Sequence, residues 1–157
     1  MASERPKQFT EADLRRSKPF IKAMSAANVF VFRLTGGRLG SKFVSHGSPV
    51  GLLTTTGRKS GAKRVAPLIY LADGPRVVLV ASLGGMPKHP VWYLNLEKNP
   101  DASFETRENG NRSYRARRAN TEEKAALWPR LCAVYPDYAD YQARTERDIP
   151  VMVLEPR

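Results

Sequence analysis

Residues 50–81 read VGLLTTTGRKSGAKRVAPLIYLADGPRVVLVA, and this stretch predicts the fold. It holds three short apolar runs that are rich in β-branched residues, at 50–55, 64–71 and 77–81, and such runs are typical of strands. A basic turn framed by glycines separates the first two runs, and the sequence Asp73-Gly74-Pro75, which is typical of turns, precedes the third. Strands joined by turns this short favour an antiparallel sheet.

The segments on either side add helices and further strands. An apolar residue recurs every three or four positions from Lys18 to Leu34, which predicts one amphipathic helix. Further elements are expected as a helix at 90–98, strands at 102–106 and 113–118 around Asn109-Gly110, helices at 120–134 and 137–144, and a strand at 151–154. We therefore expect a mainly β fold with flanking helices: about six antiparallel strands curled into a barrel. Residues 18–157 would form this single domain, after a flexible or loosely helical N-terminal arm at 1–17.

Composition excludes several classes of protein. The chain has 157 residues, of which 41% are hydrophobic and 26% charged, as in a globular domain rather than a disordered or fibrous chain. A single cysteine, Cys132, excludes an intramolecular disulfide framework and any CxxC motif. The polar start has no apolar core of a signal peptide, so we expect a cytoplasmic protein.

The formal net charge of +11 predicts an anionic partner or ligand, although a basic surface can also serve solubility alone. The densest basic cluster lies in residues 54–64, where Arg58, Lys59 and Arg64 accompany the hydroxyl of Ser60. Cations, hydroxyls and glycine-exposed N–H groups are what phosphate and carboxylate groups bind. The spacing does not match a Walker A loop, and an ordinary basic hairpin turn explains the residues about as well.

Two further segments could form a pocket. Residues 81–95, ASLGGMPKHPVWYLN, lead from a strand through two glycines into an aromatic helix, so a flat ring could approach the backbone there. Tyr135, Tyr138 and Tyr141 share one helix face, where they could bind an aromatic substrate or pack in the core. No His or Cys stands at metal-ligand spacing, so no metal site is expected.

Five segments in order carry a family resemblance: LLTTTGRKSG, PLIYL, ASLGG, PKHPVWYLNL and YPDYADYQARTERDIPVMVLEP. Together they resemble the deazaflavin-dependent nitroreductase family, over about residues 18–156. The resemblance implies a split β-barrel of the FMN-binding-like type. It also implies an oxidoreductase that transfers a hydride from reduced coenzyme F-420, an 8-hydroxy-5-deazaflavin, to a quinone or similar acceptor and, in some members, to nitro compounds.

The resemblance also implies site residues. Those for the cofactor are Arg58, Lys59, Ser60, Arg64, Val65, Ala66, Pro67, Leu68, Val80, Ala81, Ser82, Leu83, Val91, Trp92, Asn95 and Tyr138. Those for the acceptor are Ile69, Tyr135, Tyr138 and Tyr141. Tyr138 is the expected proton donor and Ser82 the alternative. The chain departs from the best-known members at Leu83, where they carry a lysine, and at Ile69, where they carry a tyrosine, which favours quinone over nitroimidazole reduction.

The sequence leaves two alternative functions open and suggests a membrane contact. The basic turn could instead hold the phosphate of FMN in a related split-barrel oxidoreductase. A basic nucleic-acid-binding module is the third possibility, but the chain has no obvious stripe of aromatic and basic residues for single strands. The helix at 18–34 could also contact the anionic inner face of the cell membrane, where an apolar quinone dissolves. Packing of that helix on the barrel is the competing interpretation.

Overall fold

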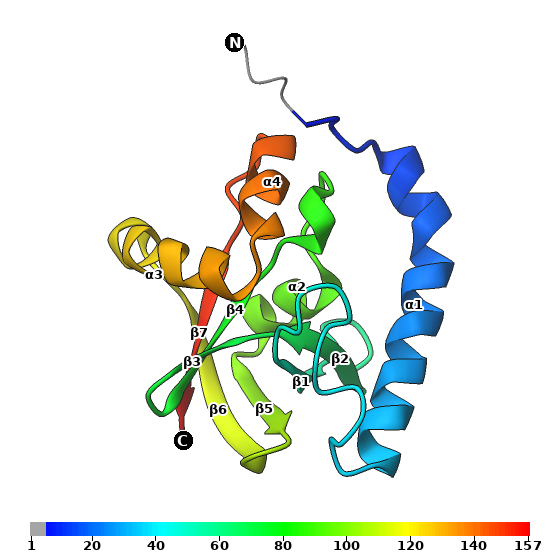
Figure 1. Ribbon diagram of the computed structural model, residues 1–157, viewed down its shortest axis with the longest axis vertical. Coiled ribbons are helices and arrows are strands. Elements are labelled where there is room, and N and C mark those ends of the chain that lie inside the picture. Colours follow the sequence, from blue (N-terminus) through cyan, green and yellow to red (C-terminus); the bar gives the residue numbers. More distant parts are fainter. Residues whose placement is uncertain (1–5) are drawn as a thin grey trace.

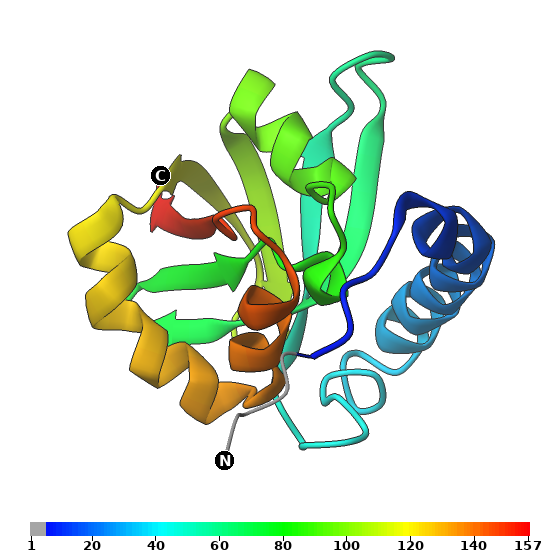
Figure 2. The same cartoon turned by 90° about the horizontal axis from the view of Figure 1, so that it is seen from above.

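The computed structural model describes residues 6–157 and shows one curled sheet with helices packed around it (Figures 1 and 2). The sheet has seven strands in the order β2-β1-β5-β6-β7-β4-β3, and neighbouring strands are antiparallel. In chain order the elements are α1 (Glu11–Leu34), β1 (Val50–Thr56), β2 (Lys63–Ile69), β3 (Leu71–Asp73), β4 (Arg76–Val80), a 3-10 turn (Leu83–Gly85), α2 (Val91–Lys98), β5 (Asp101–Thr106), β6 (Gly110–Arg118), α3 (Thr121–Val134), α4 (Asp137–Arg144) and β7 (Val151–Pro156). The predicted fold class is confirmed.

The additional strand arises at Tyr70, which divides the run that we expected as one strand at 64–71. Strands β2 and β3 flank this one residue, yet they lie at opposite edges of the sheet. The Tyr70 N–H donates to the carbonyl of Pro49 over 3.2 Å instead of continuing the β2 ladder. Because its two edge strands are one residue apart in sequence, the sheet has to curl so that the end of β2 comes near the start of β3. No ladder of hydrogen bonds joins these two described strands, so the barrel stays split between them.

Two hydrophobic cores lie on the two faces of the sheet. Successive side chains of a strand point to opposite faces, so Val77 and Leu79 of β4 pack inside the barrel, while Val78 and Val80 pack against α3 and α4. The inner core also contains Trp92, Tyr93 and Leu96 of α2, which plugs one side of the barrel. Figure 2 shows α3 and α4 on one side of the sheet and α1 on the other.

Helix α1 begins earlier than the apolar spacing predicted. Thr10 and Asp13 form a capping box, in which the Asp13 N–H donates to the Thr10 hydroxyl over 3.2 Å and the Thr10 N–H donates to the Asp13 carboxylate over 2.8 Å. Residues 11–17 are therefore helical and continuous with the rest of α1, so of the two forms expected for the arm at 1–17 the flexible one is wrong for this part. The first five residues of that arm lie outside the described residues.

The apolar stripe predicted on this helix does not pack on the barrel. Phe20, Met24 and Leu34 are 67%, 57% and 73% exposed, whereas Phe32, off the stripe, is 1% exposed and anchors the end of the helix. The side of α1 that faces the barrel instead lines a cavity. Phe32 thus attaches the C-terminal end of the helix, while an ion pair between Glu11 and Lys88 over 3.5 Å joins its N-terminal end to the loop before α2. The upper part of α1 stands beside the sheet (Figure 1).

Candidate active site

A cavity of about 930 Å³ lies between α1, strand β2, the end of β4 and helix α2. It is lined by most of the predicted cofactor residues, which come from four separate segments: Arg58, Arg64, Val65, Ala66, Pro67, Leu68, Val80, Ser82, Leu83, Val91, Trp92 and Asn95. Lys59 and Ser60, at the tip of the basic turn, are exposed and do not line it, and Ala81 is fully buried in the inner core.

The basic turn forms the cationic end of the cavity. The Gly57 N–H donates to the carbonyl of Ala62 over 2.7 Å and closes the turn, while Lys98 donates to the carbonyl of Arg58 over 2.9 Å. Within residues 6–157, neither Arg58 nor Arg64 forms an ion pair with a carboxylate. These two cations therefore remain available to an anionic ligand. Lys59, at the tip of the turn, can contact the part of a ligand that extends out of the cavity.

Strand β2 and helix α2 supply the apolar walls. Val65, Ala66, Pro67 and Leu68 follow one another along β2 and are all half-buried, and Trp92 of α2 is buried between this wall and the inner core. An apolar slot with charges at its mouth can accept a flat ring and keep its polar tail at the turn.

The segment after β4 forms the third wall and has an unusual backbone. Leu83 has φ 43°, a left-handed conformation that a leucine rarely adopts, and Gly84 and Gly85 follow with φ 64° and 78°. A Cβ on Gly85 would lie 2.7 Å from the carbonyl of Tyr141, so the loop touches α4 here. The buried Ser82 lines the cavity, and its hydroxyl makes no hydrogen bond to any of residues 6–157.

Arg147, between α4 and β7, is a cavity residue that the sequence did not predict. Its guanidinium lies against the loop after β4, and burial lowers the pKa of Arg147 from its ordinary value. It is 65 residues from Ser82 in sequence, so no local pattern links the two. Helix α1 adds Leu14, Lys18 and Ile21 to the cavity, on a helix face that periodicity assigned to solvent.

The predicted acceptor residues lie elsewhere. Tyr135 and Tyr138 belong to the outer core under α3 and α4, with Tyr141 and Ile69 packed against it, and none of these residues lines the cavity. The Tyr135 and Tyr141 hydroxyls bond each other over 2.9 Å. Tyr138 and Tyr141 belong to α4, whereas Tyr135 follows the end of α3 in an extended conformation, so the single helix face expected for the three tyrosines does not form. Burial raises the pKa of Tyr138 far above its ordinary value. This placement differs from the prediction that Tyr138 faces the cofactor pocket.

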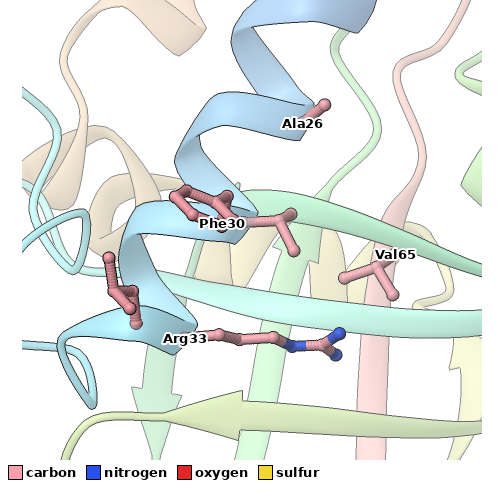
Figure 3. A pocket seen from close by; sticks show the side chains of 6 residues that line it. Ala26, Phe30, Arg33 and Val65 are labelled. Atoms are coloured by element: carbon pink, nitrogen blue, oxygen red, sulfur yellow. The ribbon is translucent and has the colours of Figure 1, made fainter.

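A second, more open groove of about 530 Å³ adjoins the cavity. Ala26, Phe30 and Arg33 of α1 form one side and Val65 of β2 the other (Figure 3). Val65 lines both hollows, so the groove extends the cavity along α1.

The model of the family "F420H(2)-dependent quinone reductase" matches residues 25–156. The chain belongs to this family. A Mycobacterium tuberculosis protein named for the same family is 44% identical over 109 residues, which is 69% of this chain and 91% of that protein.

Two further relatives agree. An F420H(2)-dependent quinone reductase of Mycobacterium tuberculosis is 35% identical over 132 residues. These residues cover 81% of this chain and 86% of that protein. The solved structure of an F420-H2 dependent reductase superposes with a TM-score of 0.61 at 42% identity, covering 68% of this chain and 94% of its own. The deazaflavin-related family predicted from the motifs is therefore confirmed.

Proposed function

We propose that this family member is an oxidoreductase that transfers a hydride from reduced coenzyme F-420 to a quinone. The observation that carries the proposal is a set of cations without carboxylate partners among the described residues, placed at the mouth of a large cavity with apolar walls. Coenzyme F-420 combines a flat deazaflavin ring with a phosphodiester and an acidic tail, so its parts match the walls and the mouth respectively.

The basic turn would hold the anionic part of the cofactor. Arg58 and Arg64 line the cavity, and they would bind the phosphodiester. Lys59 is exposed at the turn tip and would bind the oligoglutamate tail. The ring would lie against the β2 wall, Val65 to Leu68, and against Trp92. When bound, the cofactor supplies the hydride, so the protein has to orient the reactants, exclude water and donate hydrogen bonds.

Ser82 is the residue that we assign to hydrogen bonding at the reacting ring. It lies at the end of β4 on the cavity wall, and its hydroxyl is free of partners among residues 6–157. A hydroxyl there can stabilise negative charge that develops when hydride is transferred. Tyr138, in the outer core, then has a packing role.

We further propose that the exposed side of α1 contacts the anionic inner face of the cell membrane. Within residues 6–157, no helix combines the length and the apolar character needed to cross a membrane. Phe20, Met24 and Phe30 are exposed on α1, and the exposed Arg16 lies one turn before Phe20, as on helices that lie in a bilayer surface. The groove beside Phe30 would receive an apolar quinone from the bilayer.

Cofactor titration tests the proposed function. The purified protein is titrated with coenzyme F-420, FMN and NADPH, and turnover is followed with a quinone and with a nitroimidazole. We expect binding and quinone reduction with coenzyme F-420 only. Tight FMN binding without coenzyme F-420 binding would instead support the FMN-dependent alternative. Salt-sensitive affinity for DNA or RNA without either cofactor would support the nucleic-acid-binding alternative.

A further inference from the structure

The side chain of Arg147 joins four acceptors on one wall of the cavity. Its Nε donates to the carbonyl of Met86 over 2.9 Å, its Nη1 to that of Ala81 over 3.1 Å, and its Nη2 to that of Ser82 over 2.6 Å. Nη1 also lies 3.1 Å from Nδ1 of His89. One planar group thus connects both ends of the segment 81–89, which includes the left-handed Leu83.

These contacts fix the orientation of two peptide groups. In a trans peptide the C=O and the following N–H point in opposite directions. Since the carbonyls of Ala81 and Ser82 point at Arg147, the N–H groups of Ser82 and Leu83 point away from it. The strained backbone at Leu83 needs such surrounding bonds to persist. Arg147 therefore determines the shape of this wall.

The charge of Arg147 is not neutralised by a carboxylate. Within residues 6–157 it forms no ion pair, and its side-chain hydrogen-bond partners there are three carbonyls and an imidazole. Arginine stays protonated even when partly buried. A structural arginine needs no position on a ligand cavity, yet this one lines the cavity together with His89.

The arginine also determines the protonation of His89. A guanidinium only donates, so Nδ1 of His89 must accept, which leaves a neutral ring with its proton on Nε2. Arg118 of β6 adds positive charge and Glu97 of α2 adds negative charge near the ring, while Tyr93 packs on it at 4.8 Å. Burial, followed by the charge of Arg147, lowers the pKa of His89.

We propose that Arg147 is a positioning residue of this site: it holds the wall at 81–89 and keeps the proton of His89 on Nε2, where this N–H donates to a carbonyl-type oxygen of the ligand ring. The ligand part rests on the proposed function, because the deazaflavin ring carries such oxygens. The cationic turn and the Arg147–His89 pair lie beside opposite ends of α2. Eight residues of helix span about 12 Å, so the two polar sites can bind different parts of one long ligand.

The first test uses the free protein and needs no cofactor. The chain has two histidines, His46 and His89, so nitrogen-15 NMR resolves both rings, and a His46→Gln variant assigns them. We expect His89 to carry its proton on Nε2 and to stay neutral below its ordinary pKa. In Arg147→Met we expect mixed tautomers and a pKa that rises toward the ordinary value, with His46 unchanged. An Nδ1 proton in the wild type, or an unaltered His89 in Arg147→Met, would overturn the proposal.

The second test measures binding of coenzyme F-420 by fluorescence, without turnover. Arg147→Met and His89→Phe should each weaken binding about tenfold. Arg147→Lys keeps the charge but cannot bridge four acceptors, so we expect a similar loss. Arg112→Met, an exposed cation on β6, is the control and should bind normally. If Arg147→Met does not fold, His89→Phe together with the wild-type tautomer decides the question.

The two proposals fail separately. A wild-type protein that does not bind coenzyme F-420 contradicts the proposed function, whereas the NMR result on the free protein is unaffected. Normal binding by folded His89→Phe contradicts the ligand contact of His89 alone, because the wild type still binds.

Discussion

The side-chain oxygen of Asn95 accepts the backbone N–H of Arg58 over 3.1 Å, which ties the basic turn to helix α2. The same amide donates from Nδ2 to the hydroxyl of Thr55 over 3.1 Å. Asn95 is 1% exposed, so both bonds are sheltered from water. The cationic end of the cavity is therefore attached to α2 by one buried side chain, in addition to the more exposed bond from Lys98 to the Arg58 carbonyl.

Replacing Asn95 should affect both stability and binding. Asn95→Ala leaves the Arg58 N–H and the Thr55 hydroxyl without their partner, which should lower the free energy of unfolding by about 1–3 kcal/mol. Affinity for coenzyme F-420 should also fall, because the turn loses its attachment. Urea unfolding and fluorescence titration measure the two effects, with the exposed Asn111→Ala as control. Unchanged affinity would show that the turn keeps its shape without Asn95.

Removing single cations should weaken cofactor binding in proportion to their contact with it. Arg64→Ala should cost about 1.5–3 kcal/mol of binding free energy, since it removes a charge-assisted contact at the cavity. Lys59→Ala should cost less with a short-tailed cofactor, because Lys59 lies outside the cavity. Both losses should shrink at high salt. Equal affinity of both variants and the wild type at low salt would leave the basic turn without a role in binding.

The two candidate hydroxyl donors can be separated by substitution. Ser82→Ala should slow quinone reduction about tenfold through the loss of one hydrogen bond, with little change in cofactor affinity. Tyr138→Phe keeps the packing of the outer core, so its rate should stay within about twofold of the wild type. Single-turnover kinetics with bound cofactor measure the step. The opposite pattern would return the proton-donor role to Tyr138, as the sequence predicted.

Stability should fall in acid partly through Asp73. Hydrogen bonds from Arg130 and Arg76 hold the pKa of Asp73 below its ordinary value. The carboxylate therefore stabilises the fold above about pH 4, and this contribution disappears as the pH falls through the folded pKa. The difference in unfolding free energy between wild type and Asp73→Asn should be larger at pH 7 than at pH 3. Urea titrations measure it, with the exposed Glu146→Gln as control.

The membrane proposal depends on the exposed face of α1. A Phe20→Ser, Met24→Ser double variant should bind anionic vesicles about tenfold more weakly, because less apolar surface enters the bilayer. Reduction of a long-tailed quinone in vesicles should slow, whereas a water-soluble quinone should react normally. Vesicles of neutral lipid are the control for the basic residues. Full vesicle binding by the folded variant would assign the exposed apolar face another role.

Local sequence patterns predicted the sheet well, because strands and turns are local. The strand at 50–56, the capped helix at Asn120 and the helix at 137–144 all follow from short-range chemistry. The break at Tyr70 was missed, since it arises from closure of the barrel rather than from any turn residue. The start of α1 differs from the prediction for another reason: the capping box of Thr10 and Asp13 is a local signal, but the prediction followed apolar periodicity, which is absent at 11–17.

The site was predictable only where the motif itself forms the wall. Arg58, Arg64 and residues 65–68 of β2 line one cavity because the motif that contains them folds into its walls, and their role in cofactor binding stays a prediction. Tyr138 shares its helix face with core residues, and spacing alone cannot separate a buried face from a pocket face. Arg147 is held at the cavity by hydrogen bonds to three backbone carbonyls of a loop that is distant in sequence. Every residue has a backbone carbonyl, so the sequence of that loop does not reveal the contact.

Strand β2, at the edge of the sheet, bonds to β1 alone and presents its other edge toward α1. An unpaired strand edge invites another chain to add to it, which is a common origin of aggregation. Pro67, in the middle of β2, has no N–H to offer such a chain, and α1 stands in its path. Helix α1, which closes the cavity, thus also protects the β2 edge from pairing with another chain. A variant that lacks residues 1–34 would expose this edge and should aggregate more readily.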